Sequence, residues 1–322
     1  MSYDVITIGE TMLRLSPPSP LTLEQSQHLE VHIGRSESNV AIGLARLGMR
    51  VAWLSRVTNN TLGDKLMNAI RAHGVDTSHV IRTDEDRVGL YWYESGSSPR
   101  ESSVIYDRKN SAMANISPNQ ISAGIFQKGN AKLLHVTGIS LAISDSAKAT
   151  LYETVRLAKQ AGFLISFDVN YRSLLWSPEQ AYEACHTVAQ DADLIFIAAR
   201  DTVTLYDCST DYDEAILSMS QLYPEAHVIM TTGKHGAMMM KGNQLFKQGT
   251  YQTQPIDRLG GGDAFVAGFL YAYLSNYSSQ DCLRWGCASA AYKYSISGDI
   301  PLLNKHQIQK IVMGDNSNDL IR

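Results

Sequence analysis

The chain has 322 residues, of which 44% are hydrophobic and 19% are charged, and its formal net charge is -4 at pH 7. This composition is typical of a globular protein with a substantial core, and it lacks the basic excess that binds nucleic acid or anionic membranes. No apolar run approaches the roughly 20 residues that span a bilayer. We therefore expect no nucleic acid and no membrane as partner.

The cysteines and the N-terminal residues indicate in which cellular compartment the protein acts. Four cysteines, Cys185, Cys208, Cys282 and Cys287, include no C-x-x-C pair, which favours reduced thiols. The first residues, MSYDVITIGE, lack the basic start and the cleavage site of a signal peptide. The histidines show no zinc-ligand spacing such as H-E-x-x-H. These features predict a cytoplasmic protein.

The N-terminal part alternates apolar strands with amphipathic helices. Residues 3–8 predict a buried strand, and 38–47 predict a helix with Ala41, Leu44 and Leu47 on one face. A second strand at 50–57 and a second helix at 63–73 follow.

Two segments interrupt this alternation. Residues 11–33 are polar and contain short β-like pieces, and residues 87–110 contain two aromatic runs around a Gly/Ser/Pro turn, which indicates a hairpin. We predict that both are inserted in a single domain over residues 1–322 and together form a small β-sheet lid.

From residue 131 onward, apolar runs alternate regularly with helical patterns. The strand-like runs AKLLHVTG, LISFDVN, DLIFIAA and AHVIMTT are separated by predicted helices at 145–161, 178–190 and 212–222. This order predicts an α/β fold with a mostly parallel sheet flanked by helices on both faces. Such sheets bind ligands at the carboxyl ends of their strands.

The stretch DRLGGGDAF, residues 257–265, places Gly260, Gly261 and Gly262 directly before Asp263 and an apolar helix. Glycine amides at a helix start form an anion site, and an acid beside them can take a proton from an attacking hydroxyl. From these residues alone, a tight turn with Asp263 as a helix cap is an equally good interpretation.

This stretch resembles the C-terminal signature of the ribokinase-like (pfkB) sugar kinases, and Arg258 and Gly261 resemble the 2-keto-3-deoxygluconate kinases within that family. GRSESN at residues 34–39 is similar to the family's N-terminal glycine motif, with Arg35 in place of its second glycine. The similar motifs follow the family's order along essentially the whole chain. The resemblance implies a ribokinase-like fold with a β-sheet lid.

The resemblance also implies residues that bind the sugar. By motif, these are Gly34, Tyr91, Tyr106, Arg108, Arg172, Asp263 and Asp299. An arginine fork suits a carboxylate, which favours a sugar acid over a neutral hexose. Without the resemblance, the tyrosines would indicate cross-strand packing, Asp299 a turn acid, and Arg172 a structural ion pair with Asp168.

ATP and Mg²⁺ are the implied cofactors. The residues expected to contact ATP are Asn170, Arg172, Thr231, Gly233, Gly236, Gly260, Gly262 and Cys287. The family's N-x-x-E motif, which organises magnesium hydration, is replaced here by Ala198-Ala-Arg-Asp201. Asp201 is therefore the expected metal contact, through water.

These features together predict ATP-dependent phosphorylation of a sugar acid, with 2-keto-3-deoxy-D-gluconate as the best substrate and O6 as the acceptor. Asp263 is the predicted general base, and the amides of Gly260, Gly261, Gly262 and Asp263 form the predicted anion hole. Two alternatives stay open: a fructokinase-like enzyme for a neutral ketose, and a sugar-binding regulator with weak activity. The lid could also form a homodimer.

Overall fold

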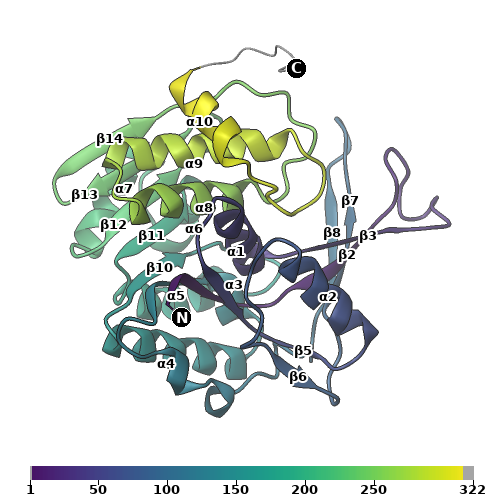
Figure 1. Cartoon of the computed structure of the whole chain (residues 1–322). Coiled ribbons are helices and arrows are strands. Elements are labelled where there is room, and N and C mark those ends of the chain that lie inside the picture. Colours follow the sequence, from purple (N-terminus) through teal and green to yellow (C-terminus); the bar gives the residue numbers. More distant parts are fainter. Residues whose placement is uncertain (1, 315–322) are drawn as a thin grey trace.

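The computed structural model describes residues 2–314, which form a large sheet flanked by helices and a smaller sheet beside it (Figure 1). The large sheet has eight strands in the order β14-β13-β12-β11-β10-β9-β1-β4. Its strands are β1 (Tyr3–Ile8), β4 (Val51–Leu54), β9 (Ala131–Thr137), β10 (Leu164–Asp168), β11 (Leu194–Ala198), β12 (His227–Thr231), β13 (Ala237–Lys241) and β14 (Gln244–Gln248).

Six of these strands are parallel, and β13 and β14 add an antiparallel hairpin at one edge. The parallel strands are buried along nearly their whole length, as continuous apolar runs require when helices cover both faces of a sheet. The prediction of a mostly parallel sheet flanked by helices is confirmed.

Alternate residues of β1 enter two separate cores: Val5 packs on one face of the sheet, and Ile6 and Ile8 pack on the other. The first face is covered by α1 (Ser36–Arg46), α2 (Thr61–Arg71), α8 (Gly261–Leu274), α9 (Ser279–Tyr294) and α10 (Lys305–Met313). The second is covered by α3 (Gly138–Ala142), α4 (Asp145–Gln160), α5 (Pro178–Ala189), α6 (Ala199–Tyr206) and α7 (Tyr212–Leu222), with short 3₁₀ turns at Pro118–Gln120, Ala123–Ile125 and Gly233–His235.

Helix α8 lies between α1 and α9, and this position explains its almost continuous apolar sequence. Its residues from Ala264 to Ala272 are all buried. It nevertheless has only 14 residues, and no helix in the described part of the chain combines the length and the apolar character needed to cross a bilayer.

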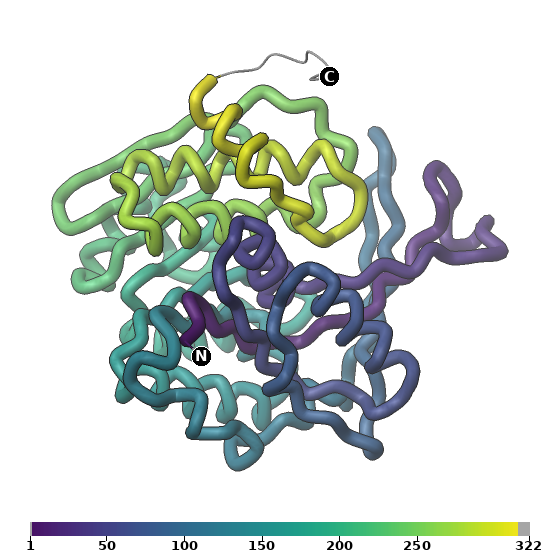
Figure 2. The backbone as a smooth tube through the Cα atoms, viewed as in Figure 1, coloured from purple at the N-terminus to yellow at the C-terminus, as the bar shows by residue number. Residues whose placement is uncertain are grey.

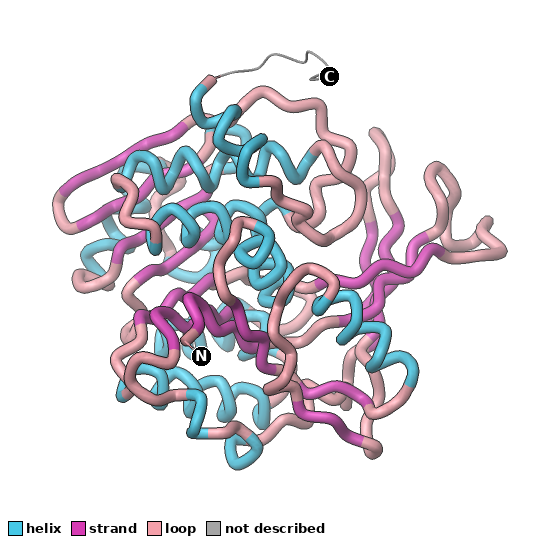
Figure 3. The backbone as a smooth tube through the Cα atoms, viewed as in Figure 1, coloured by secondary structure: helices cyan, strands magenta, loops and turns pink. Residues whose placement is uncertain are grey.

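The smaller sheet contains four strands in the order β3-β2-β7-β8. They are β2 (Met12–Ser16), β3 (Glu30–Gly34), β7 (Leu90–Glu94) and β8 (Ser103–Asp107). Segments far apart in the sequence thus lie side by side, purple against blue in Figure 2, and Figure 3 shows these strands apart from the main sheet. A further parallel pair joins β5 (Arg56–Thr58) to β6 (Ile81–Thr83).

Candidate active site

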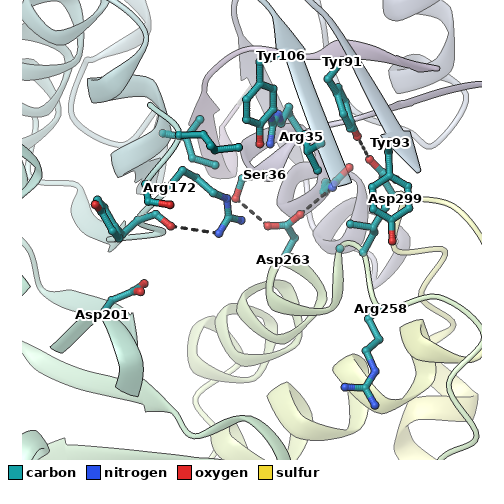
Figure 4. Close-up of a pocket in the computed structure, with 18 of the residues that line it drawn as sticks. Arg35, Ser36, Tyr91, Tyr93, Tyr106, Arg172, Asp201, Arg258, Asp263 and Asp299 are labelled. Atoms are coloured by element: carbon teal, nitrogen blue, oxygen red, sulfur yellow. Dashed lines mark hydrogen bonds between the residues drawn. The ribbon is translucent and has the colours of Figure 1, made fainter. Parts of the chain in front are cut away.

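A cavity of about 820 Å³ opens where the smaller sheet meets the first turns of α1 and α8, the loop after β10 and helix α6 (Figure 4). Its lining comes from segments that are distant in the sequence. The lining residues include Arg35, Ser36, Asn39, Tyr91, Tyr106, Arg172, Asp201, Arg258, Gly260, Asp263 and Asp299.

Asp263 lies in the first turn of α8 with its carboxylate held from two sides. Ser36 Oγ donates to one carboxylate oxygen and Asn39 Nδ2 to the other, each at 2.7 Å. Burial raises the pKa of Asp263, and the hydrogen bonds from Asn39 and Ser36 offset only part of this rise. A carboxylate that is oriented, accessible from the cavity and more basic than an ordinary aspartate can accept a proton from a bound hydroxyl.

The glycines before Asp263 give this helix start its shape. Gly260 has a left-handed backbone with φ 71°, and a Cβ there would lie 2.1 Å from the carbonyl oxygen of Asp299. A Cβ on Gly262 would meet nothing within 4 Å, so open space lies above this turn. The first amides of a helix have no intrahelical partner and carry the positive end of its dipole. This turn can therefore hold a phosphoryl group.

The smaller sheet supplies the opposite wall of the cavity. Tyr91 Oη and Arg14 both donate to the carboxylate of Asp299, which is buried. A Cβ on Gly34 would lie 2.6 Å from Cβ of Asp299, so only glycine permits this approach of the sheet to the loop after α9. Gly34, Tyr91 and Asp299 are thus brought together, as the sequence predicts for the sugar site.

Arg172 and Asn170 follow strand β10; Arg172 lines the cavity, and Asn170 contacts the lining residue Ser36. Asn170 Nδ2 donates to Ser36 Oγ at 2.8 Å, and Arg172 Nη1 to the carbonyl oxygen of Tyr171 at 3.3 Å. No ion pair joins Arg172 to Asp168 among residues 2–314, so the structural alternative for this arginine is not observed. Burial, together with the charge of Asp263, raises the pKa of Asp168 to about 8.

Asp201 lines the cavity beyond Arg172, and its side chain is only 5% exposed. Its carboxylate accepts from Nε of Arg200 at 3.3 Å. No group of three Asp, Glu, His or Cys residues suited to a metal ion occurs in the described part of the chain. One carboxylate fits a hydrated Mg²⁺ that takes its remaining ligands from phosphate and water.

Six of the residues expected to contact ATP do not line this cavity: Asn170, Thr231, Gly233, Gly236, Gly262 and Cys287. Thr231 ends β12 and pairs in register with Ala198, the last residue of β11, so both lie at the carboxyl ends of the parallel strands. Gly233 and Gly236 form the turn after it. Cys287 is 6% exposed in the core around α9, and burial raises the pKa of its thiol to about 12.

Arg108, another residue expected to bind the sugar, lies outside the lining of the cavity. Its guanidinium is turned to Glu10, which also accepts from Ser111. The side chains of Arg108 and Glu10 are 6% and 4% exposed. A guanidinium paired with a buried carboxylate stabilises the junction of the two sheets, and the expected contact of Arg108 with the substrate stays a prediction.

Three residues of α1 matter more than sequence reasoning indicated. Ser36 and Asn39 hold Asp263, although a serine at a helix start is most simply explained as a cap. Glu37 is buried and accepts from Thr137 at 2.7 Å and Ser140 at 2.6 Å. These bonds fix the start of α1 against the end of β9.

Comparison with known proteins identifies the family. The model of the pfkB family carbohydrate kinases matches residues 3–305, so the chain belongs to this family of sugar-phosphorylating enzymes. A 2-dehydro-3-deoxygalactonokinase of Haloferax volcanii is 33% identical over 98% of this chain and 99% of its own length. A 2-dehydro-3-deoxygluconokinase of Bacillus subtilis is 33% identical over 93% and 92%, respectively.

Among solved structures, the 2-dehydro-3-deoxygluconokinase of Thermotoga maritima superposes with a TM-score of 0.92. It is 28% identical in sequence and covers 98% of this chain and 99% of its own. The expected resemblance and the ribokinase-like fold are therefore confirmed.

The role of Arg108 gives a first prediction. Replacing Arg108 with Gln leaves Glu10 buried without a counter-charge, so we expect the free energy of unfolding to fall by about 3–5 kcal/mol. Urea denaturation measures this loss. The double variant Glu10→Gln/Arg108→Gln serves as control and should regain part of the stability. An Arg108→Gln protein of unchanged stability, with a raised KM for a sugar acid, would instead make Arg108 a substrate ligand.

Proposed function

We propose that the protein phosphorylates O6 of a 2-keto-3-deoxy sugar acid with ATP, and that 2-keto-3-deoxy-D-gluconate (2-dehydro-3-deoxygluconate) is its best substrate. The observation that carries this proposal is the position of Asp263. Its carboxylate faces a cavity with a glycine-rich helix start on one side and the tyrosine-bearing sheet on the other. A base between an anion site and a polyol site is the arrangement that phosphoryl transfer requires.

In this proposal, Asp263 removes the proton of the acceptor hydroxyl as that oxygen attacks phosphorus. The amides of Gly260, Gly261, Gly262 and Asp263 face the phosphoryl oxygens, and the dipole of α8 favours their negative charge. Bound MgATP supplies the γ-phosphoryl group, with Mg²⁺ offsetting the charge of the phosphates.

Residues around this centre would orient the two substrates. Arg172 and Asn170 lie where they can contact the phosphates, with Asp201 beyond them for hydrated Mg²⁺. The nucleotide would extend along the carboxyl ends of the strands toward Thr231, the Gly233–Gly236 turn and Cys287, because β11 and β12 end side by side there. Tyr91, Asp299 and the backbone at Gly34 would contact the sugar.

Two further proposals concern the smaller sheet and the setting. This sheet would act as a lid that excludes water from the cavity during transfer. Its outer face exposes Val31 and Ile105, which are 47% and 56% exposed, and would pair with a second copy in a homodimer. The cytoplasm, where ATP is available, would be the site of action.

The nature of the substrate is supported by the relatives and by charge. The two relatives described above are named for 2-dehydro-3-deoxy sugar acids. Arginine side chains in the cavity suit an anionic acceptor better than a neutral ketose.

Release of ADP with a panel of acceptors tests the function. The panel contains 2-keto-3-deoxygluconate, its galactonate epimer, D-fructose and D-ribose, each assayed with MgATP. We expect turnover with 2-keto-3-deoxygluconate to exceed that with the neutral sugars in kcat/KM. Higher kcat/KM with fructose would favour the neutral-ketose kinase. Tight binding of a sugar acid without ADP release would favour the regulator.

The role of Asp263 gives a separate prediction. Replacing Asp263 with Asn keeps the shape of the side chain but removes the base, so kcat should fall by about two orders of magnitude or more. The KM values for both substrates should change little, because the remaining contacts are retained. Steady-state kinetics provide the measurement. Wild-type kcat in this variant would remove Asp263 from its proposed role.

A further inference from the structure

Arg35 is the residue at which this chain departs from the glycine motif, and its side chain enters the cavity. The guanidinium carbon lies 4.9 Å from the ring centre of Tyr91 and 4.8 Å from that of Tyr106. In Figure 4, Arg35 lies on the same side of Asp263 as these two tyrosines and away from Asp201 and Arg258. The charge is therefore presented to the sugar side of the cavity.

Arg35 has Tyr106 as a hydrogen-bond partner, but no carboxylate of residues 2–314 forms an ion pair with it, and two of its nitrogens lack an acceptor. Its Nε and Nη2 atoms are shielded from solvent and have no hydrogen-bond partner among residues 2–314. Arg14 and Arg108 nearby also contain shielded N–H groups without a partner, but each of them has a counter-charge: Arg14 donates to Asp299 and Arg108 donates to Glu10. Shielded N–H donors without acceptors destabilise a protein unless a ligand supplies the acceptor.

The surroundings of Arg35 carry excess positive charge. Burial opposes ionisation of Tyr106. The charge of Arg35, a hydrogen bond from Arg35 and the charges of Arg172 and Arg108 outweigh burial and lower the pKa of this phenol. Burial lowers the pKa of Arg108, and the charge of Arg35 adds to this effect. An environment that favours a phenolate also favours a bound carboxylate.

The acids of the cavity do not neutralise Arg35. Asp299 accepts from Arg14 and Tyr91, and Asp263 accepts from Ser36 and Asn39. The planar guanidinium lies against two aromatic rings, and its Nε and Nη2 atoms form the edge that can donate two parallel hydrogen bonds to one carboxylate.

We propose that Arg35 binds the carboxylate of the acceptor and makes the enzyme selective for sugar acids over neutral ketoses. This inference rests on the proposed function and names the residue that recognises the substrate class. Arg35 directly precedes Ser36, which holds Asp263. The backbone at the start of α1 thus couples recognition of the acid to the position of the base.

Replacement of Arg35 by Gln and by Lys tests this role. For Arg35→Gln we expect the KM for 2-keto-3-deoxygluconate to rise about 10- to 100-fold, with the KM for ATP within about twofold of wild type. Arg35→Lys keeps the charge but loses the fork, so it should recover only part of the affinity. Turnover of D-fructose should be unchanged or improved in Arg35→Gln.

A matched control is Arg100→Gln, in the loop that joins β7 to β8. Arg100 pairs with Glu94 outside the cavity, so the same change of charge on the same sheet should leave the KM for the sugar acid unchanged. An unchanged KM for the sugar acid in Arg35→Gln would overturn the inference. A parallel rise in the KM for ATP would overturn it too, because the guanidinium would then serve a phosphate. A higher kcat/KM for the sugar acid would show that Arg35 obstructs the acceptor.

Binding without ATP separates failure of this inference from failure of the proposed function. Thermal unfolding and calorimetry with 2-keto-3-deoxygluconate should show stabilisation of the wild type and its loss in Arg35→Gln. If the wild type binds the sugar acid but does not turn it over, and Arg35→Gln does not bind it, the proposed function is refuted and the role of Arg35 in binding the carboxylate is supported. If the wild type turns over the sugar acid and Arg35→Gln does so with an unchanged KM, the proposed function is supported and the role of Arg35 in binding the carboxylate is refuted. The ligand-free variant should be at least as stable as wild type, since an unpaired charge is removed.

Discussion

Two hydrogen bonds between the start of α1 and the first turn of α8 hold the structure of the site together. Through them, Ser36 and Asn39 fix both oxygens of Asp263. The start of α1 is held in turn, because its buried Glu37 accepts from Thr137 at the end of β9 and from Ser140 in α3. The base is therefore positioned by the main sheet and not by a loop, which is the rigidity that proton transfer at a fixed distance needs.

The smaller sheet is attached to this frame by charge as much as by packing. Arg14 and Tyr91 converge on Asp299, while Arg108 converges on Glu10, so each buried charge in these two clusters has a counter-charge. Among the described residues that line the cavity, Arg35 has no carboxylate partner and holds two shielded donors without an acceptor, which makes it informative. The ion pair with Glu10 places Arg108, which was expected to bind substrate, at the junction of the two sheets.

Sequence patterns predicted the elements that local chemistry determines. The apolar run after Asp263 forms α8, and the aromatic hairpin forms β7 and β8. The expected strand at 50–57 divides into β4 and β5 at Ser55, and the β13–β14 hairpin has no counterpart among the expected elements. Partners far apart in the chain could not be predicted: Asp263 is 227 residues from Ser36, and Glu10 is 98 residues from Arg108. Such pairs depend on topology, which periodicity does not encode.

The pH dependence of kcat in Asn39→Ala tests the central claim most directly. Removing this donor destabilises the ionised form of Asp263, so the pKa of Asp263 rises. Because activity requires the carboxylate, acidification then abolishes activity at a higher pH than in the wild type. We predict that the acidic limb of the profile shifts upward by about one pH unit. Ser38→Ala, whose hydroxyl donates to the carbonyl oxygen of Arg35 and not to Asp263, should keep the wild-type profile. An acidic limb in Asn39→Ala that superimposes on that of the wild type would contradict the account.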